Sequence, residues 1–158
     1  MIPMMISVHF RRKKMKFVIQ RVNHAKVEIE GRVSGEIEKG LLVFIGIGLE
    51  DDEKIADKFL QKLMKLRIFA DENGKTNLSI QDVGGALLLV SQFTLMANCW
   101  DGNRPSFTNA QKPDRANELY EYIIAKAKET GIGIQTGEFG ADMQVNLVND
   151  GPFTVILE

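Results

Sequence analysis

The sequence has little of the side-chain chemistry on which most enzymes rely. Its 158 residues include one cysteine and two histidines. The lone cysteine, Cys99, excludes an internal disulfide and favours a reducing, cytoplasmic location. His9 and His24 lie far from it in the chain and match no ligand spacing of a zinc or iron site. We therefore expect neither a bound metal nor another cofactor.

Charge of one sign and long apolar runs are also lacking. The chain has 20 Lys and Arg against 21 Asp and Glu, a net charge of −1. It therefore has no overall attraction to nucleic acid or to an anionic membrane, and an RNA partner would need a local basic patch. No apolar run approaches the ~20 residues that span a bilayer. Since 44% of the residues are hydrophobic, the sequence predicts one soluble domain with a normal core and no membrane partner.

Residues 1–14 differ from the rest of the chain. An apolar start is followed by basic residues at positions 11–14, which reverses the charge order of a secretory signal. We expect a disordered leader here, although an upstream translation start or a weak basic anchor for RNA would give the same pattern. Residues 15–158 are expected to form the single domain.

The apolar patterns that follow predict strands, a helix, strands, a second helix and strands. The helices begin near Asp52 and at Pro113, each with one apolar face. An early turn around His24 and a later turn over residues 149–152 separate neighbouring strands. This order indicates a mixed α/β (α+β) fold, with a largely antiparallel curled sheet or barrel-like β layers and two helices packed on one face. Because two helices cannot cover every apolar strand, either the sheet curls on itself or a second subunit covers it.

One buried run opens directly onto polar groups. Residues 87–90 form a continuous apolar segment, which is typical of a strand buried on both faces. Ser91, Gln92 and Thr94 follow without a break, so their side chains would emerge from a rigid core strand where catalysis could use them. A purely structural role is the alternative, because such residues are common at strand ends. No histidine lies nearby as a base, and residues 98–109 predict a surface loop able to act as a lid.

Four motifs and the start of the first predicted strand share their residues with a known family. They are SQFTL at 91–95, GNRPSF at 102–107, FGADM at 139–143, NDGPFT at 149–154 and FVIQRV at 17–22. In these segments the chain resembles D-aminoacyl-tRNA deacylases from Met15 to its C-terminal end. The resemblance implies a homodimeric hydrolase that cleaves the ester between a D-amino acid, or glycine, and the terminal adenosine of tRNA. Such an activity is chiral proofreading in translation.

The resemblance also implies roles for single residues. Those that would line the reacting carbonyl are Ser91, Gln92, Phe93 and Thr94. Gly151 and Pro152 would carry a cis peptide bond, project into the partner subunit's pocket and reject L-substrates. The other substrate-binding residues would be Asn149, Phe139, Gly140, Ala141 and Met143. Two positions depart from the family pattern: Phe153 stands where many members have valine, and residues 98–101 replace more basic residues.

The expected mechanism needs little side-chain chemistry. Without a nearby histidine, the site would orient a reactive ester and stabilise its oxyanion with backbone N–H groups. A water positioned by the tRNA ribose hydroxyl is favoured over attack by Thr94, because an unassisted threonine is weakly nucleophilic. Two other classes of function stay open. One is a non-catalytic module that binds the tRNA end or adenosine, and the other is a homodimeric structural protein.

Overall fold

The computed structural model describes residues 14–158 and is organised around one long strand, β1 (Lys16–Ile29). β2 (Arg32–Ile37) and β3 (Gly40–Gly46) pair with different halves of one edge of β1, and β8 (Gln144–Leu157) runs along its other edge. All three pairings are antiparallel. The leader expected over residues 1–14 lies outside the described residues, apart from Lys14.

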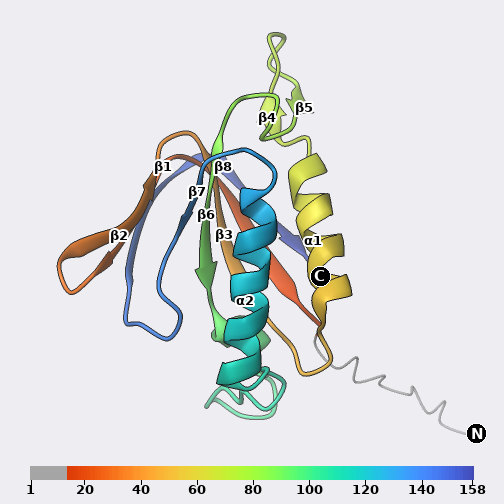
Figure 1. Cartoon of the computed structure of the whole chain (residues 1–158), viewed down its shortest axis with the longest axis vertical. Helices are drawn as coiled ribbons and strands as arrows, with labels where there is room; N and C mark the ends of the chain where they lie inside the picture. Colours follow the sequence, from red (N-terminus) through yellow and green to blue (C-terminus); the bar gives the residue numbers. More distant parts are fainter. Residues whose placement is uncertain (1–13) are drawn as a thin grey trace, which may run out of the picture.

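Two further strands extend the sheet by parallel pairing. β6 (Ala86–Ser91) lies beside β3, and β7 (Ile134–Thr136) lies beside β6. β2 then comes back toward β7, where the Ser34 hydroxyl donates a hydrogen bond to the carbonyl oxygen of Thr136 at 3.1 Å. The sheet is therefore curled almost into a barrel, as predicted, with antiparallel and parallel pairs together (Figure 1).

The structure corrects two predicted strand breaks. The sequence predicts turns around His24 and over residues 149–152, but β1 and β8 each continue through these positions. His24 pairs with Val148 in the middle of the ladder. The register between the two strands shifts between Gln20 and Val22 and again between Val22 and His24. Extra residues are thus taken up as bulges within a long pair of strands, which periodicity alone does not reveal.

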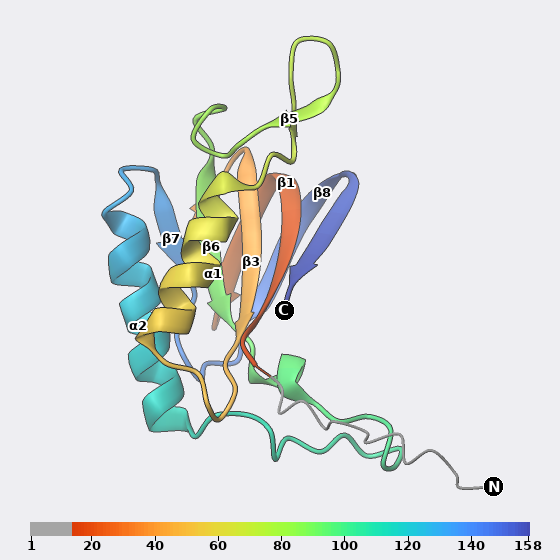
Figure 2. The ribbon, with the colours of Figure 1, turned by 90° about the vertical axis from the view of Figure 1, so that its right-hand side faces the viewer.

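Both helices lie on one face of the sheet, as predicted (Figure 2). α1 (Glu53–Lys65) begins where the side chain of Asp52 accepts a hydrogen bond from the Ile55 backbone N–H at 3.0 Å. α2 (Pro113–Lys128) begins with proline, whose fixed φ suits the first helical position.

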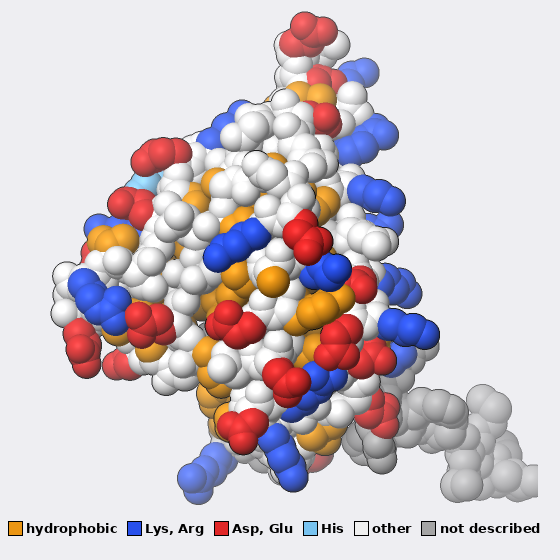
Figure 3. Space-filling model, viewed as in Figure 1, with side chains coloured by type: hydrophobic (Ala, Val, Ile, Leu, Met, Phe, Trp, Pro, Cys, Tyr) orange, Lys and Arg blue, Asp and Glu red, His pale blue; other side chains and the backbone are white. Residues whose placement is uncertain are grey.

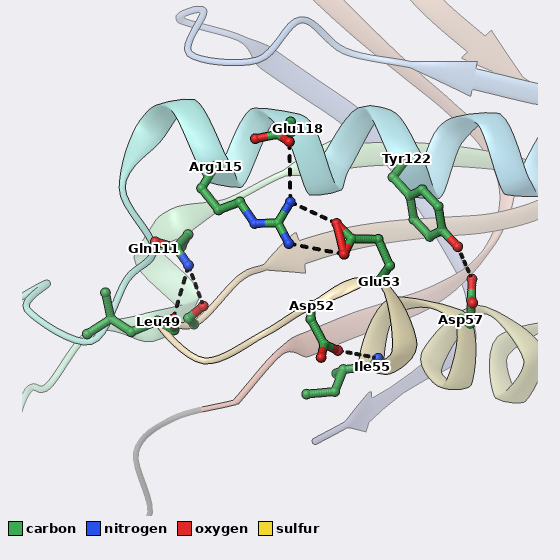
Figure 4. A network of polar contacts seen from close by, with 10 residues as sticks. Leu49, Asp52, Glu53, Ile55, Asp57, Gln111, Arg115, Glu118 and Tyr122 are labelled. Atoms are coloured by element: carbon green, nitrogen blue, oxygen red, sulfur yellow. Dashed lines mark hydrogen bonds and ion pairs between the residues drawn. The ribbon is translucent and has the colours of Figure 1, made fainter.

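Polar pairs join the two helices on their outer side (Figure 4). Arg115 of α2 forms an ion pair with Glu53 of α1 at 2.7 Å. About two helical turns further along α2, the Tyr122 hydroxyl donates a hydrogen bond to Asp57 at 2.8 Å. These contacts fix how the start of α2 sits beside α1, and the start of α2 borders the pocket described below.

The central strands separate two hydrophobic cores. Leu87 and Leu89 of β6 face the helices, whereas Leu88 and Val90 face the opposite side, and all four are buried. The prediction that residues 87–90 are buried on both faces is therefore confirmed. The second core is covered by the curled sheet itself together with the segment that leads into β8. Curling thus covers the apolar face that two helices leave open.

A small hairpin stands apart from the main sheet. β4 (Phe69–Ala70) pairs with β5 (Thr76–Leu78) at the end of the molecule beyond α1 (Figure 1). It turns through Gly74, whose φ of 76° lies in the region that favours glycine. A 3₁₀ turn, η1 (Phe93–Met96), follows β6 at the opposite end of the sheet.

The surface carries both signs of charge. In the middle of the face seen in Figure 3, Lys and Arg side chains are mixed with Asp and Glu, whereas Lys and Arg side chains gather along the right-hand edge, over α1. Within residues 14–158, no helix is long and apolar enough to cross a membrane.

Candidate active site

The main pocket opens where two parallel strands end. β3 and β6 point the same way, so their carboxyl ends share one edge of the sheet. A cavity of about 680 Å³ lies at this edge, between these strand ends, the start of α2 and residues 139–143. Its size falls within the range of ~300–1,000 Å³ that is usual for ligand pockets.

The chain turns sharply as it leaves β6. Ser91 is the last residue of the strand, and the Gln92 backbone N–H donates to the carbonyl oxygen of Ile45 at 2.8 Å. Residues 93–96 then wind into η1 instead of continuing the strand, which corrects the expectation that Thr94 emerges from a straight strand end. Ser91, Gln92 and Phe93 line the pocket. Thr94 is exposed, is not a lining residue, and accepts a hydrogen bond from the Gln92 side-chain amide.

Gly46 is the reason the turn can pack so closely. A Cβ atom at this position would lie 2.8 Å from both the Leu95 Cβ and the Met96 Cε. Real Cβ atoms essentially never approach other atoms so closely, so only glycine lets η1 rest against the end of β3. Met96, which is fully buried, anchors the turn from below.

Residues 139–143 form the opposite wall of the pocket. The four predicted residues of this segment, Phe139, Gly140, Ala141 and Met143, all line the cavity. Phe139 is supported from α2 by the Tyr120 ring, with centroids 6.2 Å apart. Burial raises the pKa of the Tyr120 phenol, which stays neutral and donates a hydrogen bond to the Leu89 carbonyl oxygen at 2.7 Å.

Three further residues complete the rim, and sequence reasoning did not single them out. Phe107 packs edge-on against Phe93, with ring centroids 5.1 Å apart. The Gln111 side chain donates a hydrogen bond to the Leu49 carbonyl oxygen at 3.1 Å (Figure 4). The Gln111 backbone N–H donates to the carbonyl oxygen of Ile47. Lys112 lies beside Gln111 at the pocket wall. Phe107 closes the GNRPSF motif and was therefore detectable, whereas Gln111 and Lys112 follow no pattern.

The remaining predicted residues lie elsewhere, on exposed β8. Gly151 and Pro152 are joined by a cis peptide bond, are exposed, and do not line the pocket of their own chain. The Asn149 side chain accepts a hydrogen bond from the Phe153 backbone N–H at 2.7 Å and donates one to the Thr154 hydroxyl at 2.9 Å. Asn149 thus holds the chain on both sides of the Gly-Pro pair.

Arg21 of β1 supports the same part of β8, around Gly151 and Pro152. Its guanidinium donates to the backbone oxygens of Asp150 at 3.1 Å and Ile68 at 2.7 Å. It also lies over the Phe153 ring, 4.6 Å from the centroid, so the aromatic residue that departs from the family pattern has a packing partner. Arg21 belongs to the FVIQRV motif, but its role could not be deduced without the pairing of β1 with β8.

The pocket offers few groups for acid–base chemistry. Lys112 and Asp142 are the ionisable residues that line it within the described chain, and neither histidine nor cysteine is present there. Over residues 14–158 no group of three or more His, Cys, Asp or Glu side chains is arranged to hold a metal ion. The arrangement suits binding and orientation of a ligand through apolar walls and main-chain polar groups.

Comparison with known proteins agrees with this architecture. The family model described as D-Tyr-tRNA(Tyr) deacylase matches residues 18–158. The D-aminoacyl-tRNA deacylase of Pseudoalteromonas translucida (strain TAC 125) is 58% identical over 140 residues, which are 89% of this chain and 97% of that protein. A solved structure described as c-Myc DNA unwinding element binding protein is 39% identical, with a TM-score of 0.86 over 90% of this chain and 97% of that one. Another, a probable eukaryotic D-amino acid tRNA deacylase, shares the fold with a TM-score of 0.78 at 14% identity over 90% of this chain and 98% of that one.

Fold and site together define an α+β protein with an apolar pocket at the ends of two parallel strands. The sequence and structural matches then fix the family. The chain belongs to the D-Tyr-tRNA(Tyr) deacylase family.

Proposed function

We propose that the pocket holds the aminoacylated terminal adenosine of tRNA while its ester to a D-amino acid is hydrolysed. The reaction itself follows from the family: the chain is a hydrolase that removes D-amino acids from tRNA, a proofreading step in translation. The observation that carries the site assignment is the meeting of residues 91–93 and 139–143, far apart in sequence, around one cavity of about 680 Å³.

Main-chain groups supply the oxyanion stabilisation in this proposal. The first hydrogen bond inside η1 runs from the Leu95 N–H to the Gln92 carbonyl oxygen at 3.3 Å. The N–H groups of Phe93 and Thr94 precede it and have no partner within the turn. When it is directed at the carbonyl oxygen of the ester, where the negative charge develops, each such donor stabilises the transition state by ~3 kcal/mol.

The nucleophile is a water molecule positioned by the ribose hydroxyl next to the ester. Thr94 is a poor candidate, because its side chain is exposed and its hydroxyl already accepts a hydrogen bond from Gln92. An unassisted threonine hydroxyl is also weakly nucleophilic near neutral pH. Ser91 and Gln92 serve to position the substrate at the strand end.

Selection against L-amino acids is assigned to Gly151 and Pro152 of a second copy of the chain. They are too far along β8 to line their own pocket, yet they are exposed and firmly held by Asn149. β8 pairs only with β1 among the described strands and exposes Val148 and Ile156 by 55% and 54%. Apolar side chains on a free strand edge favour association of two chains. In the homodimer that the family resemblance implies, this segment would lie at the partner's pocket.

A cytoplasmic location follows from the same proposal, since the substrate is aminoacylated tRNA. The one cysteine, Cys99, is free and exposed, which suits a reducing compartment.

The direct test is to incubate the protein with matched D- and L-tyrosyl-tRNA. Selective loss of the D-ester supports the enzyme. Binding of both substrates without loss of either ester would instead support a non-catalytic module for the tRNA end. Hydrolysis of both esters at equal rates would refute selection against L-amino acids by Gly151 and Pro152.

A further inference from the structure

Trp100 is the most exposed large hydrophobic side chain among the described residues. Its side chain is 96% exposed, whereas the other exposed large hydrophobics range from 38% to 55%. An indole ring is a large apolar surface that proteins usually cover at least in part. Full exposure of the chain's one tryptophan therefore needs an explanation beyond folding.

The loop that carries Trp100 is held in shape by its own hydrogen bonds. Asn98 and Ser106 exchange two backbone hydrogen bonds, of 2.7 and 2.9 Å, which close the base of the loop. The Asn98 side chain accepts a hydrogen bond from the Trp100 backbone N–H at 3.0 Å and donates one to Asp101 at 2.6 Å. The backbone around the indole is thus fixed before any ligand arrives.

This loop is tied to the mouth of the pocket. Ser106 at its base is followed directly by Phe107, which lines the cavity and contacts Phe93. Figure 2 shows the chain between η1 and α2 extending away from the sheet at the pocket end of the molecule. Arg104, also exposed, lies on the same loop. The indole and one cation therefore stand outside the pocket, beyond the place proposed for the terminal adenosine.

We propose that Trp100 stacks on a nucleobase of the single-stranded 3′ end of tRNA, upstream of the aminoacylated adenosine. This inference rests on the proposed function of the pocket. A terminal nucleotide inside the cavity leaves the preceding unpaired bases outside its mouth, and every base offers a face to an aromatic ring. Because the chain has a net charge of −1, stacking supplies affinity that overall electrostatic attraction does not.

The single tryptophan gives a specific optical signal. The full-length protein is titrated with deacylated tRNA and, separately, with adenosine monophosphate, which fills only the pocket. We expect tRNA to quench the indole emission and adenosine monophosphate to leave it unchanged. An indole that is already shielded in the free protein, and becomes exposed on dilution, would assign Trp100 to contact with a second copy and overturn the proposal.

Kinetics of Trp100→Ala, with Trp100→Phe as the conservative variant, complete the test. On D-tyrosyl-tRNA we expect KM to rise about 5- to 150-fold in the alanine variant, the equivalent of ~1–3 kcal/mol for one stacked base, with kcat within about twofold. The phenylalanine variant should recover most of the loss. Val33→Ala, which removes another exposed apolar side chain away from the pocket lining, serves as the matched control.

A short substrate, 3′-O-D-tyrosyl-adenosine, separates the possible failures. Since it lacks the upstream bases, the alanine variant and the wild type should hydrolyse it equally. An unchanged KM on tRNA, or an equal loss on both substrates, would overturn the stacking role while leaving the activity intact. If the wild-type protein hydrolyses neither substrate, the proposed function of the pocket fails instead.

Discussion

The pocket and the Gly151–Pro152 segment carry the two halves of the predicted site, and they are built in opposite ways. The pocket lies at the ends of two central strands, and its walls rest on buried residues such as Met96 and Tyr120. The segment lies on an exposed strand and is held by side-chain hydrogen bonds from Asn149 and Arg21. In the proposed function, chemistry and chiral selection are thus separated within one chain. Changes in the pocket should alter the rate, whereas changes in the segment should alter the ratio of D to L rates.

Gly46→Ala should have the largest effect, on the pocket side of this comparison. The added Cβ would meet the Leu95 Cβ and the Met96 Cε at 2.8 Å, so η1 must move and take the Phe93 and Thr94 N–H groups with it. We expect kcat/KM for D-tyrosyl-tRNA to fall about 100-fold or more, as for loss of an oxyanion donor.

Gly133→Ala is the matched control, because its added Cβ would meet only the Ala86 Cβ, at 3.3 Å. Melting temperatures of both variants show whether each is folded. A folded Gly46→Ala protein with normal kcat/KM would show that the position of η1 does not matter for catalysis.

Asn149→Ala probes the other region and should have an intermediate effect. It removes two hydrogen bonds that hold the chain beside Gly151 and Pro152, each worth ~1 kcal/mol. The ratio of D- to L-tyrosyl-tRNA hydrolysis should fall about tenfold, while D-ester hydrolysis changes less.

Asn146→Ala controls for this change, since Asn146 is an exposed asparagine of the same strand. Its D/L ratio should stay at the wild-type value. Equal ratios of D- to L-tyrosyl-tRNA hydrolysis in both variants, measured on proteins of equal oligomeric mass, would show that L-amino acids are rejected by another part of the protein.

Thr94→Val should have the smallest effect. The hydroxyl that it removes is exposed, lies outside the pocket lining and only accepts a hydrogen bond from Gln92. We expect the rate of deacylation to stay within about threefold of the wild type, because an unassisted threonine contributes little as a nucleophile. A D-tyrosyl ester trapped on Thr94 and located by mass spectrometry would reverse this assignment.

The contrast between the two regions also explains what the sequence could predict. Burial of residues 87–90 follows from an apolar run, and the pocket walls at residues 91–93 and 139–143 follow from motifs that the chain shares with the family. The course of β8 does not, because the sequence of residues 149–152 is that of a turn and only its long partner β1 keeps it in the sheet. The 3₁₀ turn after Gln92 is not predictable from the local sequence, for a related reason. It depends on the absence of a side chain at Gly46, on a strand far away in sequence.

Residues that act through tertiary contact are the least predictable from the sequence. Gln111 reaches the carbonyl oxygen of Leu49, 62 positions away, and Arg21 reaches that of Asp150, 129 positions away. Such contacts leave no periodic signal in either segment.

The central claim, that each pocket is completed by the Gly151–Pro152 segment of its partner, is tested most directly with mixed dimers. Chains carrying Gly46→Ala and chains carrying Asn149→Ala are given different affinity tags, combined, and purified through both tags. In the mixed dimer, the one intact pocket faces the intact segment of the Gly46→Ala chain. We predict that its D/L ratio returns to the wild-type value. A ratio as low as that of the Asn149→Ala homodimer would show that each segment serves its own chain, and would contradict the account.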